Sequence, residues 1–234
     1  MNRCPAIGFI VALVVVIVGS LPSFSQAITS VPTTAFPRTI YLVRHGAYVS
    51  DPMADPELGP GLTPLGIAQA RLLAARMRGM NVRLDSMTSS TMTRARETAA
   101  VMHETLSDVP LNQSPQLSEC TPPWESQGET PDEQVACAKR LDTAFAERFT
   151  PAGGSERHDV VVAHGNVIRY LVTKALGVDT RAWTNMSIAH ASLTVIRISA
   201  NGSMVVLAVG DAGHIPPNMQ GWGNDSDPQL VVPK

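Results

Sequence analysis

Short apolar runs alternate with amphipathic stretches along most of this chain. Strands are predicted where β-branched and other apolar residues cluster, at residues 39–43, 84–89, 160–163, 193–198 and 204–209, the last two as a closing hairpin. Helices are predicted where apolar residues recur every three or four positions, at residues 64–79, 93–106, 131–149 and 167–176. This alternation favours a single three-layer α/β domain, in which helices cover both faces of a mostly parallel sheet.

Capping signals mark the starts of two of these helices. Thr63 is a good N-cap residue, and Pro64 suits the first helical position. Thr130 and Glu133 have the spacing of a capping box. The helix that follows Thr130 is expected to pack on the core through one apolar face, formed by Val135, Ala138, Leu141, Phe145 and Phe149.

The first 27 residues form a separate segment. Arg3 is followed by an uncharged apolar stretch and then by Ser25-Gln26-Ala27. This order is typical of a signal peptide that is cleaved after Ala27, so we expect an exported protein, periplasmic or secreted. The alternative is an uncleaved membrane anchor, because residues 6–24 are nearly long enough to span a bilayer.

The remaining chain divides into a linker at 28–37, one domain at 38–217 and a loose tail at 218–234. A hydrophobic content of 44% and a charged content of 16% fit a globular protein rather than a disordered one. The formal net charge is −2, and no basic tract is present. We therefore expect no binding to nucleic acid, and membrane contact only if the leader is uncleaved; any anion must be bound by local groups.

A histidine and a glycine follow two of the predicted strands. Arg44-His45-Gly46 comes after residues 39–43, and His164-Gly165 comes after residues 160–163. The carboxyl ends of parallel strands meet at one edge of a sheet, where ligands bind. A neighbouring arginine cation disfavours the protonated imidazole, so Arg44 helps to keep His45 available as a nucleophile. The pattern indicates covalent chemistry on an anion.

Arg94 lies where the second predicted strand leads into a helix. A guanidinium can bind phosphoryl oxygens bidentately, and a helix N-terminus also favours an anion. With Arg44 and with His164 as a further donor, Arg94 would complete a phosphate clamp. Phosphoryl transfer needs mainly positioning and charge stabilisation, so these groups predict a reaction that requires neither a metal nor another cofactor.

Glu119, in the loop after Leu117, is the candidate proton donor to a leaving group. Its neighbour Cys120 and the later Cys137 form an even pair, and a disulfide between them is expected in an oxidising compartment. Two free thiols are the alternative. A bond would tie the loop that carries Glu119 to the following helix.

Four segments of the chain, in this order, resemble the histidine phosphatase superfamily, also called phosphoglycerate-mutase-like: Arg44-His45-Gly46, Leu62–Gly66, Ser89–Ala99 and His164-Gly165-Asn166. The resemblance spans about residues 38–217. Three further segments look like the mitochondrial Ser/Thr-protein phosphatases of this family: Ser90–Ala95, Asn166–Tyr170 and Gly210–Gly213.

The resemblance implies a metal-independent phosphomonoester hydrolase. It implies His45 as the phosphohistidine nucleophile, with Arg44, Arg94 and His164 around the phosphate. Glu119 would be the acid, and then the base that activates water. The substrate would be a phosphoprotein or a small phosphomonoester.

Two alternatives are a phosphoglycerate-type mutase and an inactive phosphate-binding or interaction module. Mutases of the family usually follow the first motif with Glu-Ser, whereas this chain has Ala47-Tyr48-Val49. The acid phosphatase branch usually has an arginine where Tyr48 stands. The first departure argues against a mutase, and the second argues against the acid phosphatase branch. The natural substrate stays open.

Overall fold

The computed structural model describes residues 34–124 and 129–222, together with Met1. Apart from Met1, the leader expected at residues 1–27 lies outside the described residues, and so do residues 223–234 of the tail. The described chain from residue 34 onward belongs to one compact unit. No helix in this part of the chain is both long enough and apolar enough to cross a membrane.

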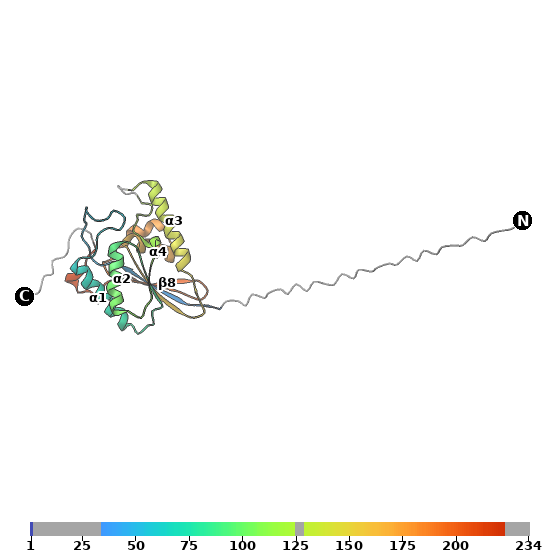
Figure 1. Cartoon of the computed structure of the whole chain (residues 1–234), viewed down its shortest axis with the longest axis horizontal. Helices are drawn as coiled ribbons and strands as arrows, with labels where there is room; N and C mark the ends of the chain where they lie inside the picture. The colour runs from blue at the N-terminus through green and yellow to red at the C-terminus, as the bar shows by residue number, and fades with distance from the viewer. Residues whose placement is uncertain (2–33, 125–128, 223–234) are drawn as a thin grey trace, which may run out of the picture. The chain divides into compact units, whose positions relative to one another are not determined.

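A six-stranded sheet with the order β4-β3-β6-β2-β7-β8 forms the centre of this unit (Figure 1). Its strands are β2 (Arg38–Arg44), β3 (Ser86–Ser89), β4 (Leu111–Gln113), β6 (Arg157–Ala163), β7 (Leu193–Ile198) and β8 (Met204–Asp211). Strands β4, β3, β6 and β2 run parallel, whereas β7 is antiparallel to β2 and to β8. The mainly parallel sheet and the closing hairpin are as predicted.

A second, two-stranded sheet pairs β1 (Ala35–Phe36) with β5 (Ala152–Gly153). Residues 35 and 36 were expected to belong to a linker. They form a strand instead because their backbone pairs antiparallel with a segment far away in the sequence, which local patterns do not reveal.

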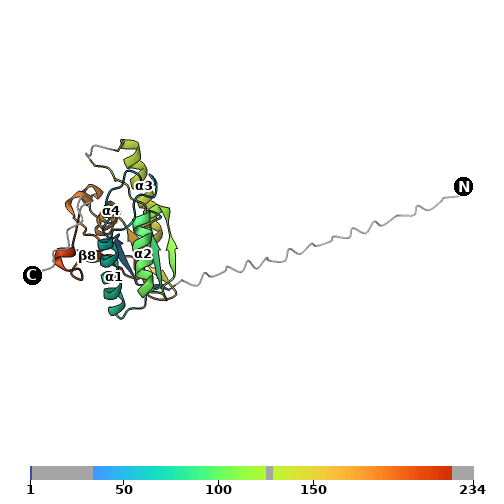
Figure 2. The ribbon, with the colours of Figure 1, turned by 60° about the vertical axis from the view of Figure 1, so that its left-hand side comes forward.

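Four helices cover the sheet: α1 (Pro64–Gly79), α2 (Thr93–Thr105), α3 (Pro131–Arg148) and α4 (Gly165–Leu176). Short 3-10 turns lie at Pro115–Leu117, Thr180–Asn185 and Pro217–Met219. Helices α1 and α2 lie side by side on one face, and α3 and α4 cover the other (Figure 2).

Alternate residues of β2 enter the two cores on opposite faces of the sheet. Tyr41 and Val43 pack with residues of α1 and α2, whereas Ile40 and Leu42 pack with residues of α3 and α4. Burial on both faces explains why the sequence of this strand is an unbroken apolar run. The three-layer α/β architecture predicted from the sequence is therefore confirmed.

Both predicted helix caps are present. The Thr63 side chain accepts a hydrogen bond from the Gly66 amide at 3.2 Å. Thr130 and Glu133 form a complete capping box at the start of α3. These contacts satisfy amide groups that the helices themselves leave without an acceptor.

The apolar face predicted for α3 is confirmed at four of its five positions, because Leu141 and Phe149 are buried and Ala138 and Phe145 pack against the same core. Val135 is 61% exposed, whereas the face buried on the domain carries Gln134, Cys137, Leu141 and Ala144. The Cys137 disulfide and two hydrogen bonds between the Gln134 side-chain amide and the Trp124 backbone attach α3 to the preceding loop. Apolar periodicity alone contains neither of these constraints.

The tail predicted to be loose from residue 218 is held against the domain as far as Trp222. The Met219 carbonyl accepts a hydrogen bond from the Gln69 side chain at 2.6 Å. The Gly221 carbonyl accepts one from the His190 amide at 2.8 Å. Every residue has a backbone carbonyl, so the amino-acid composition of the tail could not predict this attachment.

Candidate active site

The site is built at the carboxyl ends of three neighbouring strands, β3, β6 and β2. The His45 amide donates to the Ala163 carbonyl at 3.0 Å, and the Ser90 amide donates to the Val162 carbonyl at 2.9 Å. Hydrogen bonds therefore continue past the ends of β2 and β3 and hold His45 and Ser90 on either side of β6. This is the edge at which the sequence predicted the ligand to bind.

Two glycines near His45, Gly46 in the following loop and Gly66 in α1, lie too close to neighbouring backbone atoms to be replaced by a larger residue. A Cβ on Gly46 would lie 2.5 Å from the Gly66 oxygen, and a Cβ on Gly66 would lie 2.2 Å from the Ala47 oxygen. The Gly46 amide donates to Thr98 Oγ1 at 3.0 Å. The close approach fixes the backbone beside His45 against α1 and α2.

His45 is 1% exposed and is held by a hydrogen bond at each ring nitrogen. Nδ1 lies 2.8 Å from the Gly46 carbonyl oxygen, and Nε2 lies 3.2 Å from Nε of Arg94. Because a carbonyl can only accept and a guanidinium can only donate, the ring proton is assigned to Nδ1 and the lone pair to Nε2. Burial, together with neighbouring His164 and arginine cations, lowers the pKa of His45 well below 6.5. The imidazole is therefore neutral at neutral pH.

Arg44 and Arg94 are both buried beside His45, at 8% and 6% exposed. Arg44 Nη1 donates to the Ile188 carbonyl at 2.5 Å and to the Trp222 carbonyl at 3.0 Å. Burial lowers the pKa of Arg44 to about 10, so the guanidinium stays charged at neutral pH. The Arg94 guanidinium lies over the ring of Tyr48, 4.8 Å from its centroid.

His164 is fully buried, and its ring centroid lies 5.1 Å from that of His45. Its Nε2 lies 2.9 Å from Ser90 Oγ, which also accepts a hydrogen bond from the Met92 amide. When the Ser90 hydroxyl donates to Nε2, the ring proton of His164 lies on Nδ1. This nitrogen has no partner within the described residues and lies 4.0 Å from Glu119 Oε2.

The Glu119 side chain is 26% exposed and reaches the same site. Burial raises the pKa of its carboxyl above 4.5, and the cations of Arg94 and Arg44 oppose this rise. Its Oε1 has no hydrogen-bond partner in the part of the chain that the structure covers. The Glu119 amide lies 3.3 Å from the sulfur of Met92, at the N-terminus of α2.

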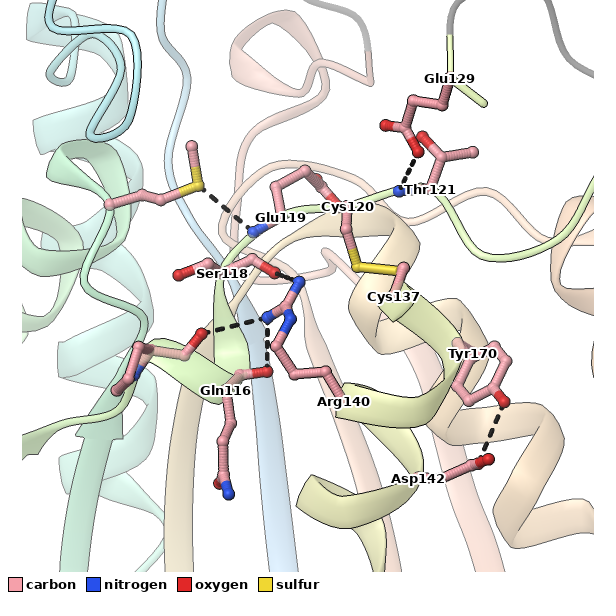
Figure 3. Close-up of a disulfide and its surroundings, with 12 residues drawn as sticks. Gln116, Ser118, Glu119, Cys120, Thr121, Glu129, Cys137, Arg140, Asp142 and Tyr170 are labelled. Atoms are coloured by element: carbon pink, nitrogen blue, oxygen red, sulfur yellow. Dashed lines mark hydrogen bonds between the residues drawn. A yellow bond between two sulfur atoms is a disulfide. The ribbon is translucent and has the colours of Figure 1, made fainter. Parts of the chain in front are cut away.

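Helix α3 supports the loop that carries Glu119 (Figure 3). Arg140 donates to the backbone carbonyls of Pro115, Gln116 and Ser118, at distances between 2.8 and 3.1 Å. Beyond Glu119, Cys120 forms a disulfide with Cys137 of α3, with a Cα–Cα distance of 5.8 Å. The loop is thus attached to the helix on both sides of the carboxylate.

These residues surround a cavity of about 450 Å³, within the usual range for small-molecule sites. Arg44, His45, Arg94 and Glu119, all predicted from the sequence, line it, and the ring of His164 lies beside that of His45 with Nδ1 4.0 Å from the Glu119 carboxylate. The rest of the lining is formed by Tyr48, Gly165, Asn166, Arg169, Ser187, Ile188 and Trp222.

Sequence reasoning missed two polar residues near the cavity. His190 is 2% exposed, its ring lies 5.5 Å from that of His45, and neither ring nitrogen has a partner among the described residues. It follows a long loop, so no local signal placed it there. Arg169 did have a signal, because it lies three residues after Asn166, on the same face of the predicted helix.

Residues 40–160 and 121–211 match the family described as Histidine phosphatase superfamily (branch 1). The mitochondrial serine/threonine-protein phosphatase Pgam5 of Caenorhabditis elegans is 36% identical over 193 residues, covering 77% of this chain and 65% of that protein. The corresponding PGAM5 of Xenopus tropicalis is 32% identical over 193 residues, covering 77% of this chain and 66% of that protein. The chain thus spans slightly less than two thirds of the length of these relatives.

The fold is also similar to that of phosphoglycerate mutase from Plasmodium falciparum. The TM-score is 0.57 and the sequence identity 26%, with 78% of this chain and 96% of the mutase covered. The motifs at the strand ends, the sheet order and these matches agree with one another. The chain belongs to the histidine phosphatase superfamily, branch 1, and is related to the PGAM5 serine/threonine-protein phosphatases.

Proposed function

We propose that the protein is a metal-independent phosphomonoester hydrolase that works through a phosphohistidine on His45. The observation that carries the proposal is the state of the His45 ring. Its Nδ1 proton is held by the Gly46 carbonyl, and the lone pair on Nε2 points at Arg94. A neutral imidazole with an oriented lone pair beside a guanidinium is what attack on a bound phosphoryl group requires.

In the first step, the phosphoryl group binds between Arg44 and Arg94, and the Arg94 hydrogen bond passes from His45 to a phosphoryl oxygen. His45 Nε2 forms a bond to phosphorus as the bond to the ester oxygen breaks. Glu119 in its protonated form, which burial favours by raising the pKa of the carboxyl, gives its proton to the departing oxygen. The products of this step are an alcohol, a phosphohistidine and a Glu119 carboxylate.

In the second step, the Glu119 carboxylate takes a proton from a water molecule as that water attacks phosphorus. The bond between phosphorus and Nε2 breaks, which releases inorganic phosphate and returns His45 to its neutral form. Glu119 is again protonated, so the cycle is closed. The Nδ1–H of His164 is suitably placed to donate to a phosphoryl oxygen in both steps.

The two buried arginines make a metal ion unnecessary in this mechanism. Fixed, buried guanidinium groups stabilise the negative charge that a metal stabilises in other phosphatases. Arg44 and Arg94 are both buried, and their orientation is fixed by the Ile188 and Trp222 carbonyls and by the Tyr48 ring.

Phosphoproteins are the substrates that the relatives support, because these are serine/threonine-protein phosphatases by name. Export is supported by the disulfide between Cys120 and Cys137, since such bonds persist in oxidising compartments. We therefore propose a periplasmic or secreted phosphatase whose leader is removed after Ala27. Mass spectrometry tests this: the mature chain should begin at Ile28, whereas an intact leader in the membrane fraction would support the anchor.

The central experiment is to trap the intermediate with a labelled phosphomonoester, with and without EDTA. Wild-type protein should carry acid-labile, alkali-stable label, and EDTA should not change turnover. His45→Ala should lose the label and at least about a thousand-fold in turnover. His103→Ala, on α2 and away from the cavity, is the control and should retain both. Label on a serine or cysteine, or activity that a divalent ion restores after EDTA, would contradict the mechanism.

A further inference from the structure

The cavity contains more positive charge than one phosphoryl group needs. Three arginines and one acid line it among the residues that the structure describes: Arg44, Arg94, Arg169 and Glu119. A phosphomonoester brings a charge of about −2. When Glu119 is protonated, as a proton donor must be, one guanidinium remains without a counter-charge.

Arg169 is the guanidinium that the phosphoryl group does not account for. Arg44 and Arg94 lie at the ends of β2 and β3, beside His45. Arg169 comes from α4, and it lies close enough to Glu119 to oppose the rise that burial causes in the pKa of that carboxyl. Arg169 lines the same cavity from α4 rather than from a strand end, so in the proposed mechanism it can face the leaving group while Arg44 and Arg94 hold the phosphoryl group.

The Arg169 guanidinium is held in a fixed orientation. It lies over the ring of Trp183, 4.5 Å from the centroid, and donates to the Met186 carbonyl at 3.2 Å and to the Asn166 side chain. Its Nε–H has no acceptor among the described residues. A planar donor group fixed in this way is suited to bidentate binding of a carboxylate or phosphate.

The start of α4 adds positive potential to the same cavity, beside Arg44, whose guanidinium lies 3.6 Å from the Cβ position of Gly165. Gly165 and Asn166 line the cavity at the first turn of the helix, where amide groups and the helix dipole present positive charge. No side chain caps this end within the described chain. Asn166 and Arg169 lie three residues apart, on one face of the helix.

We infer that Arg169 and Asn166 bind a second anionic group, carried by the leaving group of the substrate. The substrate class is then a phosphomonoester with a carboxylate or another phosphate near the ester oxygen. This inference rests on the proposed phosphatase function. The second anion has two possible sources, an acidic side chain beside a phosphoserine in a peptide or the carboxylate of a small phosphorylated acid.

Two matched substrate pairs test the inference. Free phosphoserine and phosphoethanolamine differ by one carboxylate, and a phosphoserine peptide with acidic neighbours is compared with the same peptide carrying alanines there. In wild-type protein, kcat/KM should favour the additional anion by about ten-fold or more in at least one pair. A preference in the first pair identifies a small acid, and a preference in the second identifies an acidic peptide. Equal kcat/KM in both pairs would overturn the inference.

The assignment to Arg169 is tested by the same ratio in variants. In Arg169→Gln the preference should fall to about one, and Arg169→Lys should keep part of it. Arg71→Gln, which removes an exposed charge on α1, is the control and should keep the full preference. Because each ratio is taken within one variant, a general loss of activity or of folded protein cancels.

A preference that survives in Arg169→Gln would remove Arg169 from the site. If Arg169→Gln does not fold, the wild-type ratios and Arg169→Lys still decide. Failure of the proposed function has a different signature, because wild-type protein would then not hydrolyse even an aryl phosphate.

Discussion

Arg94 Nε donates a hydrogen bond to His45 Nε2 across 3.2 Å, so the proposed phosphate ligand and the proposed nucleophile are joined before any substrate binds. This contact orients the ring and occupies the lone pair that must attack phosphorus. A bound phosphoryl group, as a stronger acceptor, would take the hydrogen bond and free Nε2 at the moment when it is needed.

Replacement of Arg94 should separate charge from geometry. Arg94→Lys keeps a cation but loses the planar fork, so kcat should fall by roughly a hundred-fold or more. Arg94→Gln also removes the charge, and the pKa of His45 should then rise toward 6.5, because Arg94 is one of the cations that lower it. NMR titration of the ring measures the pKa, and steady-state kinetics measure kcat. Full activity in Arg94→Lys would show that a point charge is sufficient.

Replacement of Glu119 should affect substrates according to their leaving groups. A serine phosphate needs a proton on its departing oxygen, whereas an aryl phosphate needs little. Glu119→Gln should therefore slow serine phosphate turnover by about a hundred-fold or more, and aryl phosphate turnover much less. The measurement is kcat for both substrates in both proteins. Equal losses would exclude Glu119 as the acid.

The pH dependence of turnover should reflect the lowered pKa of His45 and the raised pKa of Glu119. The pKa of His45 is far below 6.5, so the nucleophile stays neutral in mildly acidic solution. The pKa of Glu119 is raised above 4.5, so its proton is lost only at a higher pH than for an ordinary carboxyl. Turnover of serine phosphate should therefore be highest on the acidic side of neutrality and fall as pH rises. Glu119→Gln should lack this fall, and a wild-type rate that climbs through neutral pH would contradict the assignment.

Removal of the disulfide should weaken both stability and positioning of the acid. The bond closes a loop with a sequence separation of 17, for which the chain-entropy model gives about 3 kcal/mol of stability. Cys120→Ser/Cys137→Ser should unfold at lower denaturant and should lose serine phosphate turnover more than aryl phosphate turnover. Reductant should have the same effect on wild-type protein and none on the double variant. Unchanged substrate preference after reduction would show that Arg140 alone holds the loop.

Much of the site was predictable because its main residues lie directly at the ends of strands. An apolar run before Arg44 and His45 predicts one strand, and another before His164 predicts a second. Because these neighbouring strands are parallel, the residues that follow them meet at the same edge of the sheet. Thr63 and the pair of Thr130 and Glu133 were equally local signals. Each of these predictions needed only a few consecutive residues.

The parts that escaped prediction depend on contacts between distant segments. His190 reaches His45 only because the chain before β7 folds back over the end of β2, where the Ala191 amide donates to the His45 carbonyl. Trp222 meets Arg44 through a backbone carbonyl, which carries no sequence signal. The attachment of α3 to the preceding loop depends on Cys137, whose bonded state the sequence left open.

The proposed nucleophile and the proposed proton donor are held by different kinds of structure. His45 continues the central strand of the sheet, whereas Glu119 lies in a loop attached through Arg140, a sulfur contact and one disulfide. Regions with few regular backbone hydrogen bonds open before a protein unfolds globally. Under reducing conditions, dilute urea should therefore convert the protein into an enzyme that still cleaves activated esters but no longer releases alcohols, while its circular dichroism is unchanged. Folding of the sheet would then be sufficient to form a phosphohistidine, and closure of the loop would determine which esters are hydrolysed.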